Sequence, residues 1–208
     1  MAKRLSVNPN RMELSRLKKR LVVAKRGHKL LKDKQDALIK AFLERARQVK
    51  ALREELEKEL ALCYQSFLLA RAQTLPVMLE QALMISSMRC RVEVGQRNVM
   101  SVLIPEYEVH QEGEGLSYGL ANTSGSLDLS LERFSALLPR LIHLAAEEKG
   151  LKLMATEIEK TRRRVNALEH VLIPSFQETA RYITMKLDEQ ERAGLSRLMR
   201  IKEIVRSH

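Results

Sequence analysis

The longest stretch of the chain without proline runs from Asn10 to Leu75, and it constrains the fold more than any other feature. From Leu14 onward its apolar residues are spaced three and four apart, and eleven of fifteen positions fit a 3.5-residue period without a slip. This period predicts one long helix that begins at Asn8, Pro9 or Asn10 and coils left-handed around a partner helix. The polar exceptions on the seam are His28, Gln35, Arg45 and Glu59.

The C-terminal part of the chain repeats this spacing on both sides of Pro174. Apolar residues keep the period from Leu151 to Leu172, and beyond the proline they resume from Phe176 displaced by one residue. Proline lacks an amide N–H and clashes with the preceding turn, so we expect a kink or local unwinding at Pro174. Pro139 predicts a second bend.

Two long periodic segments separated by a different middle predict an antiparallel pair within one chain, with both termini at the same end. This pairing would bring Leu14 close to Ile201. The alternative is that each segment pairs with a second copy in a dimer, because neither segment can bury its seam alone. The seam residues that we assign are Leu14, Leu17, Leu21, Leu31, Leu38, Leu52, Leu56, Val165, Leu168, Ile183, Leu187 and Ile201.

The middle of the chain differs in composition, since five of the eight glycines lie between residues 95 and 125. The pattern predicts a strand at 91–94, a turn at 95–98 and a second strand from 99 to 104 that Pro105 ends. Residues 113–126 have the composition of a loop. The apolar sequence at 75–88 predicts a short helix that packs against the base of the helical pair. Its methionines, Met78, Met84 and Met88, favour core packing over an adaptable partner surface.

The fold class that we predict is mainly α: a long antiparallel two-helix left-handed coiled coil with a small central region that contains a short helix and a β-hairpin. We expect an N-terminal coiled-coil arm at 1–75, a central helix, hairpin and loop region at 76–126, and a C-terminal arm at 127–208. Aromatic residues make up 4% of the chain and there is no Trp. This shortage favours narrow aliphatic seams between helices over a compact core.

Charge is distributed unevenly along the chain, whose formal net charge is +11. Residues 1–34 contain 12 bases and 2 acids, residues 61–150 contain 7 bases and 10 acids, and residues 190–208 contain 5 bases and 2 acids. If the two arms bring the termini together, one end of the molecule is strongly positive. Such a surface suits nucleic acid or an acidic protein socket.

Nucleic acid is the weaker of these two interpretations. The basic residues lie on the heptads themselves, whereas a basic leucine zipper has them before the heptads. No aromatic residues for base stacking are interleaved with them. We therefore regard nucleic-acid binding as an alternative and an acidic protein partner as the main interpretation.

Signals for catalysis are poor. Gly115–Gly119 matches the spacing of a hydrolase nucleophile elbow but lies in a loop composition, and no Walker-type Gly-Lys-Ser/Thr is present. The five histidines are scattered, and Cys63 and Cys90 form neither a metal knuckle nor a disulfide framework, which is typical of the reducing cytoplasm. No apolar stretch approaches a membrane span. We expect no catalytic residue, no cofactor, no metal and no direct nucleotide binding.

Two blocks of sequence resemble the D subunit of V/A-type rotary ATPases. The first comprises Asn8-Pro9-Asn10-Arg11-Met12-Glu13-Leu14 and Arg26-Gly27-His28-Lys29-Leu30-Leu31-Lys32-Asp33-Lys34. The second is Lys160-Thr161-Arg162-Arg163-Arg164-Val165-Asn166-Ala167-Leu168-Glu169, followed by Ile173-Pro174. The resemblance covers both helical arms and, more loosely, the middle.

The resemblance implies a central-stalk subunit, a rotor shaft without catalytic residues that transmits torque between the catalytic head and the membrane rotor ring of an ion-translocating ATPase or ATP synthase. It implies a cytoplasmic location peripheral to the membrane. The implied partners are the catalytic A and B subunits, the F subunit, and a funnel-like subunit that links to the ring. The implied head-contact residues are Arg11, Arg16, Lys18, Lys19, Arg20, Arg192, Arg197, Arg200 and Lys202. The alternative is a cytoplasmic coiled-coil scaffold without a rotary role.

Overall fold

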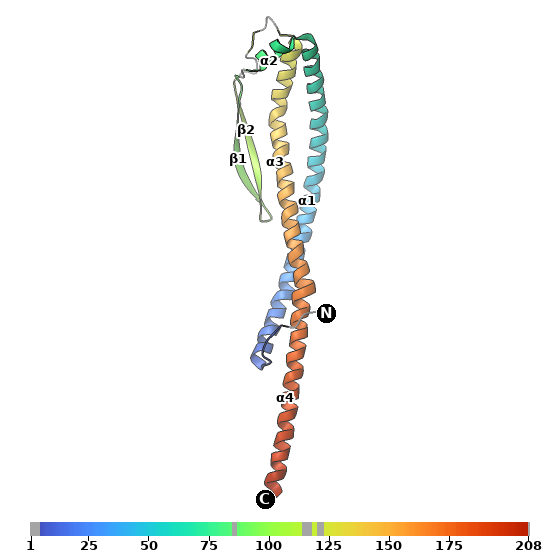
Figure 1. Cartoon of the computed structure of the whole chain (residues 1–208), viewed down its shortest axis with the longest axis vertical. Coiled ribbons are helices and arrows are strands. Elements are labelled where there is room, and N and C mark those ends of the chain that lie inside the picture. The colour runs from blue at the N-terminus through green and yellow to red at the C-terminus, as the bar shows by residue number, and fades with distance from the viewer. Residues whose placement is uncertain (1–4, 85–86, 114–117, 120–122, 208) are drawn as a thin grey trace. The chain divides into compact units, whose positions relative to one another are not determined.

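The structure is a computed structural model that describes residues 5–84, 87–113, 118–119 and 123–207. Its elements are α1 (Arg11–Gln73), α2 (Pro76–Met84), β1 (Arg89–Val99), β2 (Val102–Glu112), α3 (Gly125–Ala167), the π-helical segment η2 (Leu168–Leu172) and α4 (Ile173–Ser207) (Figure 1). The predicted fold class is confirmed. The chain is mainly helical, with long helices packed together and a short helix and an antiparallel two-stranded hairpin between them in sequence.

The chain divides into two compact units, which we describe separately. Unit 1 consists of residues 1–37 and 158–208, and unit 2 consists of residues 38–157. Helix α1 contributes its N-terminal part to unit 1 and its C-terminal part to unit 2.

Helix α1 begins where the sequence predicts. The side-chain Oδ1 of Asn10 accepts a hydrogen bond from the backbone amide of Glu13 at 2.6 Å, which satisfies one of the unpaired amides of the first turn. The Asn10 carbonyl accepts from the Leu14 amide at 3.1 Å. Asn10 is therefore the N-cap, and the proline-free stretch that follows it is helical up to Gln73.

The two arms of one chain contact each other, as the intrachain pairing predicts. In unit 1, His28 of α1 contacts Glu169 of η2, and Arg11 contacts Glu191 of α4. In unit 2, Arg45 contacts Glu147, and Arg133 donates a hydrogen bond to Ser66. Within each unit the partner's residue number falls as the number on α1 rises, so the arms run antiparallel.

The core of unit 1 combines aliphatic side chains with small polar ones. Leu17, Val165 and Ile183 are at most 5% exposed. Thr179 is 1% exposed; its hydroxyl donates to the Ser175 carbonyl at 2.7 Å and accepts from the Leu5 amide at 3.1 Å. The Thr179 hydroxyl is thereby satisfied although it is buried, and it holds the residues before α1 against α4.

The predicted unwinding at Pro174 is confirmed. Immediately before it, residues 168–172 form a π-helical turn in which the Ile173 amide donates to the Leu168 carbonyl, five residues earlier. A π-turn inserts one extra residue, and this explains why the apolar pattern beyond Pro174 is displaced by one position. By contrast, α3 stays α-helical through Pro139.

The core of unit 2 lies between α1, α2 and α3. In this unit α1 and α3 run side by side (Figure 1). Cys63 is 3% exposed and packs with Leu56 and Leu137, as its seam position predicts. Ala70 packs with Leu79 and Ala82 of α2 and with Leu127 at the start of α3. The short apolar helix therefore packs against the end of the helical pair, as predicted, although it ends at Met84.

The hairpin is longer than predicted and turns at a different place. The sequence pattern predicts the turn at 95–98, but β1 continues to Val99 and the turn consists of Met100 and Ser101, with φ of 53° and 71°. Positive φ at both central residues suits a tight hairpin turn, and Asn98 Oδ1 supports it by accepting from the Ser101 amide at 2.9 Å. Pro105 does not end β2, because the strand is at the edge of a two-stranded sheet and can lack one donor.

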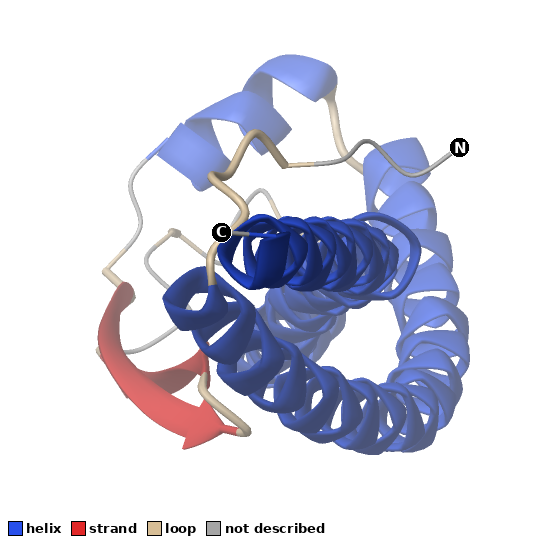
Figure 2. Cartoon of the chain, turned by 90° about the horizontal axis from the view of Figure 1, so that it is seen from below, coloured by secondary structure: helices blue, strands red, loops and turns tan. Residues whose placement is uncertain are grey.

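The hairpin is strongly twisted, and it packs on α3 at both of its ends. At the tip, Val102 and Ile104 are 6% and 2% exposed, and Ile104 packs against Gly150 of α3. At the base, the face on the opposite side of the strand contacts α3 through Gln111, whose Nε2 donates to the Ser135 carbonyl. Two-stranded ribbons twist more than larger sheets do. Figure 2 shows the pair of strands at the outside of the helices.

Candidate partner-binding surfaces

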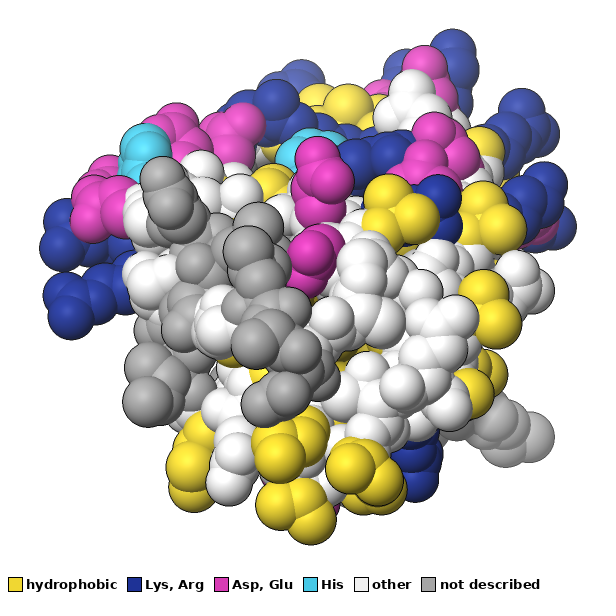
Figure 3. Space-filling model, turned by 90° about the horizontal axis from the view of Figure 1, so that it is seen from above, with side chains coloured by type: hydrophobic (Ala, Val, Ile, Leu, Met, Phe, Trp, Pro, Cys, Tyr) yellow, Lys and Arg dark blue, Asp and Glu magenta, His cyan; other side chains and the backbone are white. Residues whose placement is uncertain are grey.

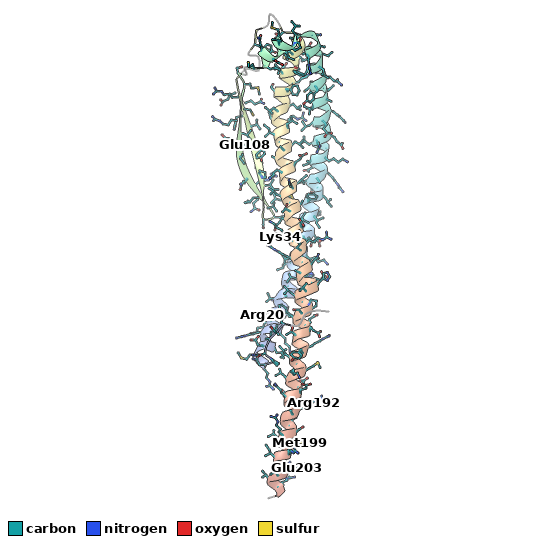
Figure 4. The ribbon with its side chains drawn as sticks, in the orientation of Figure 1. Arg20, Lys34, Glu108, Arg192, Met199 and Glu203 are labelled. Carbon is teal, nitrogen blue, oxygen red and sulfur yellow. The ribbon has the colours of Figure 1, made fainter. Side chains whose placement is uncertain are left out.

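The predicted basic cluster on α1 is solvent-exposed. Two of its members have acidic partners: Arg11 contacts Glu191 at 2.5 Å, and Arg16 contacts Glu13 at 2.7 Å. The three residues that follow, Lys18, Lys19 and Arg20, are also exposed. Figure 4 shows Arg20 on this part of α1. The positive charge that the sequence places here is therefore available to a partner.

Helix α4 extends well beyond the start of α1. Arg11 is the first residue of α1 and contacts Glu191, so residues 192–207 of α4 have no α1 residue opposite them; we call this segment the overhang. At 1.5 Å per residue the overhang is about 24 Å long. Our expectation that Leu14 lies close to Ile201 is therefore wrong. Ile201 is 56% exposed and is not a seam residue in this structure.

The overhang has exposed side chains of two kinds. Its basic residues include Arg192, Arg197, Arg200 and Lys202, all of which are exposed. Its apolar residues are more than half exposed: Leu195, Leu198, Met199, Ile201, Ile204 and Val205. Figure 4 labels Arg192, Met199 and Glu203 along it. A helix with exposed apolar side chains over several turns is typical of a surface that packs against another protein.

The remaining seam residues are buried or half-buried. The buried ones are Leu17, Leu38, Leu56, Val165 and Ile183, and the half-buried ones are Leu14, Leu21, Leu31, Leu52, Leu168 and Leu187. Sequence reasoning missed the small polar residues that share the seam, among them Thr161 at 2% exposure. Their spacing could have revealed them, because Ser175 and Thr179 lie four residues apart and Ile183 follows after another four. This spacing puts all three on one face of the helix.

His28 forms a contact between the arms. Its Nε2 lies 3.2 Å from Glu169 Oε2, and its side chain is 20% exposed. The residue therefore joins α1 to the π-helical turn next to Pro174. This geometry agrees with a role in setting the register of the two arms, which is the usual role of a polar residue on a coiled-coil seam.

One end of unit 2 has a second exposed apolar surface, which we call the apolar end. It is formed where α1 ends and α2 follows, and its side chains are between 44% and 84% exposed: Leu68, Leu69, Leu75, Val77, Leu83 and Met84. Figure 3, a view onto this end, shows hydrophobic side chains at the surface. The prediction that the methionines of this helix pack in the core is wrong for Met84, which is 84% exposed. The apolar end is a second candidate contact surface.

Tyr118 links the segment after the hairpin to the first turn of α3. Its hydroxyl donates a hydrogen bond to Asp128 Oδ1 at 2.5 Å, and its ring packs against the cluster of Ala70 and Leu79. Burial, together with the hydrogen bond to the Asp128 carboxylate, raises the pKa of Tyr118 above its ordinary value. The phenol is therefore neutral, and the pair fixes the start of α3.

The described residues contain one group that could bring three metal-ligating atoms within 4.8 Å of one another, Glu93, Glu108 and His110 on the hairpin. All three residues are exposed, and exposed carboxylates commonly gather without binding an ion. The group therefore does not indicate a metal centre. Residues 115–117 of the elbow-like match, and half of the predicted loop at 113–126, lie outside the described residues.

Among the described residues, no helix combines the length and the hydropathy that crossing a membrane requires.

Comparison with known proteins identifies the family. Residues 13–203 match the family model of the ATP synthase D subunit. The chain is 54% identical over 203 residues to the V-type ATP synthase D subunit of a Thermoanaerobacter species, and the match covers 97% of each chain. It is 51% identical to the V-type ATP synthase D subunit of Clostridioides difficile, over 97% of this chain and 92% of that one. It is 48% identical to that of Clostridium botulinum, over 97% and 96%. The chain belongs to the family of ATP synthase D subunits.

Proposed function

We propose that this chain is the central rotor shaft of a V/A-type ion-translocating ATPase or ATP synthase. In this role it has no catalytic residue, and it transmits torque between the catalytic head and the membrane rotor ring. Membership of the D-subunit family supports the proposal, as do the long helices packed along one seam. A packed two-helix seam gives a shaft the stiffness that torque transmission needs.

The overhang is the observation that carries the proposal. Residues 192–207 have exposed apolar and basic side chains without a partner helix opposite them. A shaft that turns inside a socket needs an end slim enough to enter it and apolar side chains that slide on the socket wall. The overhang meets both requirements, and we assign it to the interior of the head formed by the A and B subunits.

The basic residues give the shaft an attraction that does not lock it at one angle. Arg16, Lys18, Lys19 and Arg20 on α1, like Arg192 on the overhang, are exposed to solvent. Attraction between exposed charges and acidic stator loops acts over about 8–10 Å at physiological salt, so it changes gradually with rotation. Short buried ion pairs would hold the shaft at a single angle instead.

In this proposal the partners on the membrane side of the head bind unit 2. We assign the apolar end, including Leu75 and Met84, to the funnel-like subunit that links the shaft to the membrane ring, because exposed apolar patches of this kind are typical of stable interfaces. The F subunit binds the helical pair in this account. In this proposal the chain lies on the cytoplasmic side of the membrane, as a peripheral part of the complex.

Co-purification from native membranes tests the proposal. The tagged full-length chain is expected to bring down the catalytic A and B subunits, the F subunit and the funnel-like subunit in fixed proportion. A variant that ends at residue 191 lacks the overhang but keeps the apolar end, so it should retain the funnel-like subunit and lose the A and B subunits. Capture of an unrelated set of cytoplasmic proteins without the A, B and F subunits would favour the coiled-coil scaffold.

A further inference from the structure

The tip of the hairpin, α1 and α3 line an open cleft in unit 2 in which basic side chains outnumber acidic ones. Its volume is about 290 Å³, and its lining includes Arg45, Gln48 and Leu52 of α1, Arg97 of β1, and His143 and Glu147 of α3. Arg97, His143 and Glu147 also line a smaller adjoining cavity beside Ile104. Three elements that are distant in sequence therefore supply polar side chains to one place.

The register of the hairpin explains why Arg97 reaches this cleft. Arg97 of β1 is the direct partner of Ile104 on β2, and opposite residues of an antiparallel pair share one face of the sheet. Ile104 is 2% exposed and packs on Gly150 of α3. The packing of Ile104 therefore turns the Arg97 side of the hairpin tip toward the helices.

The side chains that line the cleft offer more hydrogen-bond donors than acceptors. Arg45 Nη1 lies 3.4 Å from Glu147 Oε2, and this pair is 18% and 26% exposed. Glu147 is the one acidic residue in the lining of this cleft, and Glu106 lines the adjoining cavity together with Arg97 and His143. Within the described part of the chain, the side chains of Arg97 and His143 have no hydrogen-bond or ion-pair partner. Within the cleft, two permanent positive charges and an imidazole thus face the Glu147 carboxylate, and Glu106 lies in the adjoining cavity. The side chains of Arg97 and His143 are solvent-exposed, so their N–H groups can reach a ligand.

We propose that this cleft binds an oxyanion of the phosphate or carboxylate class. The guanidinium groups of Arg45 and Arg97 supply charged N–H donors in the fork geometry that matches such oxygens, and His143 supplies an imidazole nitrogen. A bound anion would tie β1 to both α1 and α3, and so would hold the hairpin tip on the helices. The site does not depend on the proposed rotor role.

Two sources can present this chemistry, a free phosphate compound or the carboxylate of an acidic segment of a partner protein. The test uses the full-length chain with isotope-labelled arginine and histidine, and follows the side-chain NMR signals of Arg97 and His143. One arm adds inorganic phosphate, and the other adds a blocked tetraglutamate peptide. Equal ionic strength is kept with potassium chloride, and tetraglutamine is the neutral control. Saturable shifts with phosphate alone identify a small anion, and saturable shifts with tetraglutamate alone identify an acidic segment.

Three variants separate a built site from general charge attraction. Arg97→Gln should weaken binding by about tenfold or more, the change expected when one hydrogen bond to a charged group is lost. Arg91→Gln removes an exposed arginine from the same strand but outside the cleft, and it should leave binding unchanged. Glu147→Gln removes the competing carboxylate, so it should tighten binding severalfold.

The proposal is overturned if neither probe gives saturable shifts, or if Arg91→Gln weakens binding as much as Arg97→Gln does. If Arg97→Gln disturbs the hairpin, Glu147→Gln still decides the test. A purely structural role for Arg97 and Glu147 predicts no gain of anion affinity in Glu147→Gln. Unchanged or weaker binding in Glu147→Gln would also overturn it.

Discussion

Gly150 of α3 lies directly against Ile104 of β2, and a Cβ at position 150 would be 2.6 Å from Ile104 Cγ2. Ile104 is buried and branched at Cβ, and Cγ2 is one of the two branches, so it has little room to move. We predict that Gly150→Ala costs about 1–3 kcal/mol through overpacking, of which the better helix propensity of Ala offsets about 1 kcal/mol. Amide hydrogen exchange at Val102 and Ile104, with chemical unfolding, measures whether the hairpin tip detaches.

Gly27 is the matched control for this substitution. It is also inside a long helix, but nothing lies within 4 Å of a Cβ built there. Gly27→Ala should therefore stabilise the chain by roughly 0.5–1 kcal/mol. Ile104→Ala removes Cγ2, so Gly150→Ala should no longer destabilise the chain in that background. Equal effects of Gly150→Ala in both backgrounds would show that the contact with Ile104 is not the cause.

The register of unit 1 predicts which engineered cysteines a short crosslinker can join. In a chain whose Cys63 and Cys90 are replaced by Ser, cysteines at Arg11 and Glu191 should be linked within one chain by a short bis-maleimide reagent, because the long side chains at these positions reach each other. Cysteines at Leu14 and Ile201 should remain unlinked, because Ile201 lies in the overhang. Gel mobility of the treated chain measures the crosslink. An efficient link between positions 14 and 201 would mean that the arms are in a different register.

Tyr118 predicts a loss of stability in alkaline solution. Its pKa is raised in the folded chain by burial and by Asp128, so the neutral phenol is favoured by folding. The stabilisation is complete below the ordinary tyrosine pKa of about 10 and is lost as pH rises through the raised folded value. Tyr118→Phe should cost about 1–3 kcal/mol near neutral pH, and the difference from wild type should shrink above about pH 10. Urea unfolding at several pH values checks this; a difference that does not depend on pH would contradict it.

The basic cluster predicts a salt-dependent affinity for the head. Joint replacement of Arg16, Lys18, Lys19 and Arg20 by Gln should leave the melting temperature nearly unchanged, because the side chains are exposed and exposed pairs contribute about 0–1 kcal/mol each. Binding to the head of A and B subunits should weaken, and wild-type affinity should fall as salt approaches about 1 M. If the variant and the wild type bind equally at every salt concentration, the cluster is only a solvated face.

The long periodic elements were predictable from sequence because their burial repeats with the helical period. Even the displacement of the pattern at Pro174 was visible, and the structure accounts for it by a π-turn that ends at Leu172. The hairpin turn was not predictable in this way. Met100 and Ser101 have positive φ without being Gly, Asn or Asp, and the supporting side chain is that of Asn98.

The overhang and the cationic cleft required three-dimensional information. The apolar residues of the overhang keep a helical spacing, so the sequence alone cannot show that α1 begins opposite Glu191 and leaves them exposed. The sequence pattern puts Arg97 in a turn, and only the register that pairs it with Ile104 directs it toward Arg45 and His143. Pairings between distant segments decide both features, and local patterns carry little information about such pairings.

Observation of rotation tests the central claim most directly. Cys90 on the hairpin is exposed and Cys63 is buried, so a thiol reagent can attach a bead to the native chain at Cys90. The complex is reconstituted with an immobilised head of A and B subunits and with the F subunit, and the bead is followed by light microscopy. The rotor account predicts that the bead turns in one direction when ATP is added and stops when ATP is removed. A head that hydrolyses ATP at its usual rate while the bead on the bound chain stays still would contradict the account.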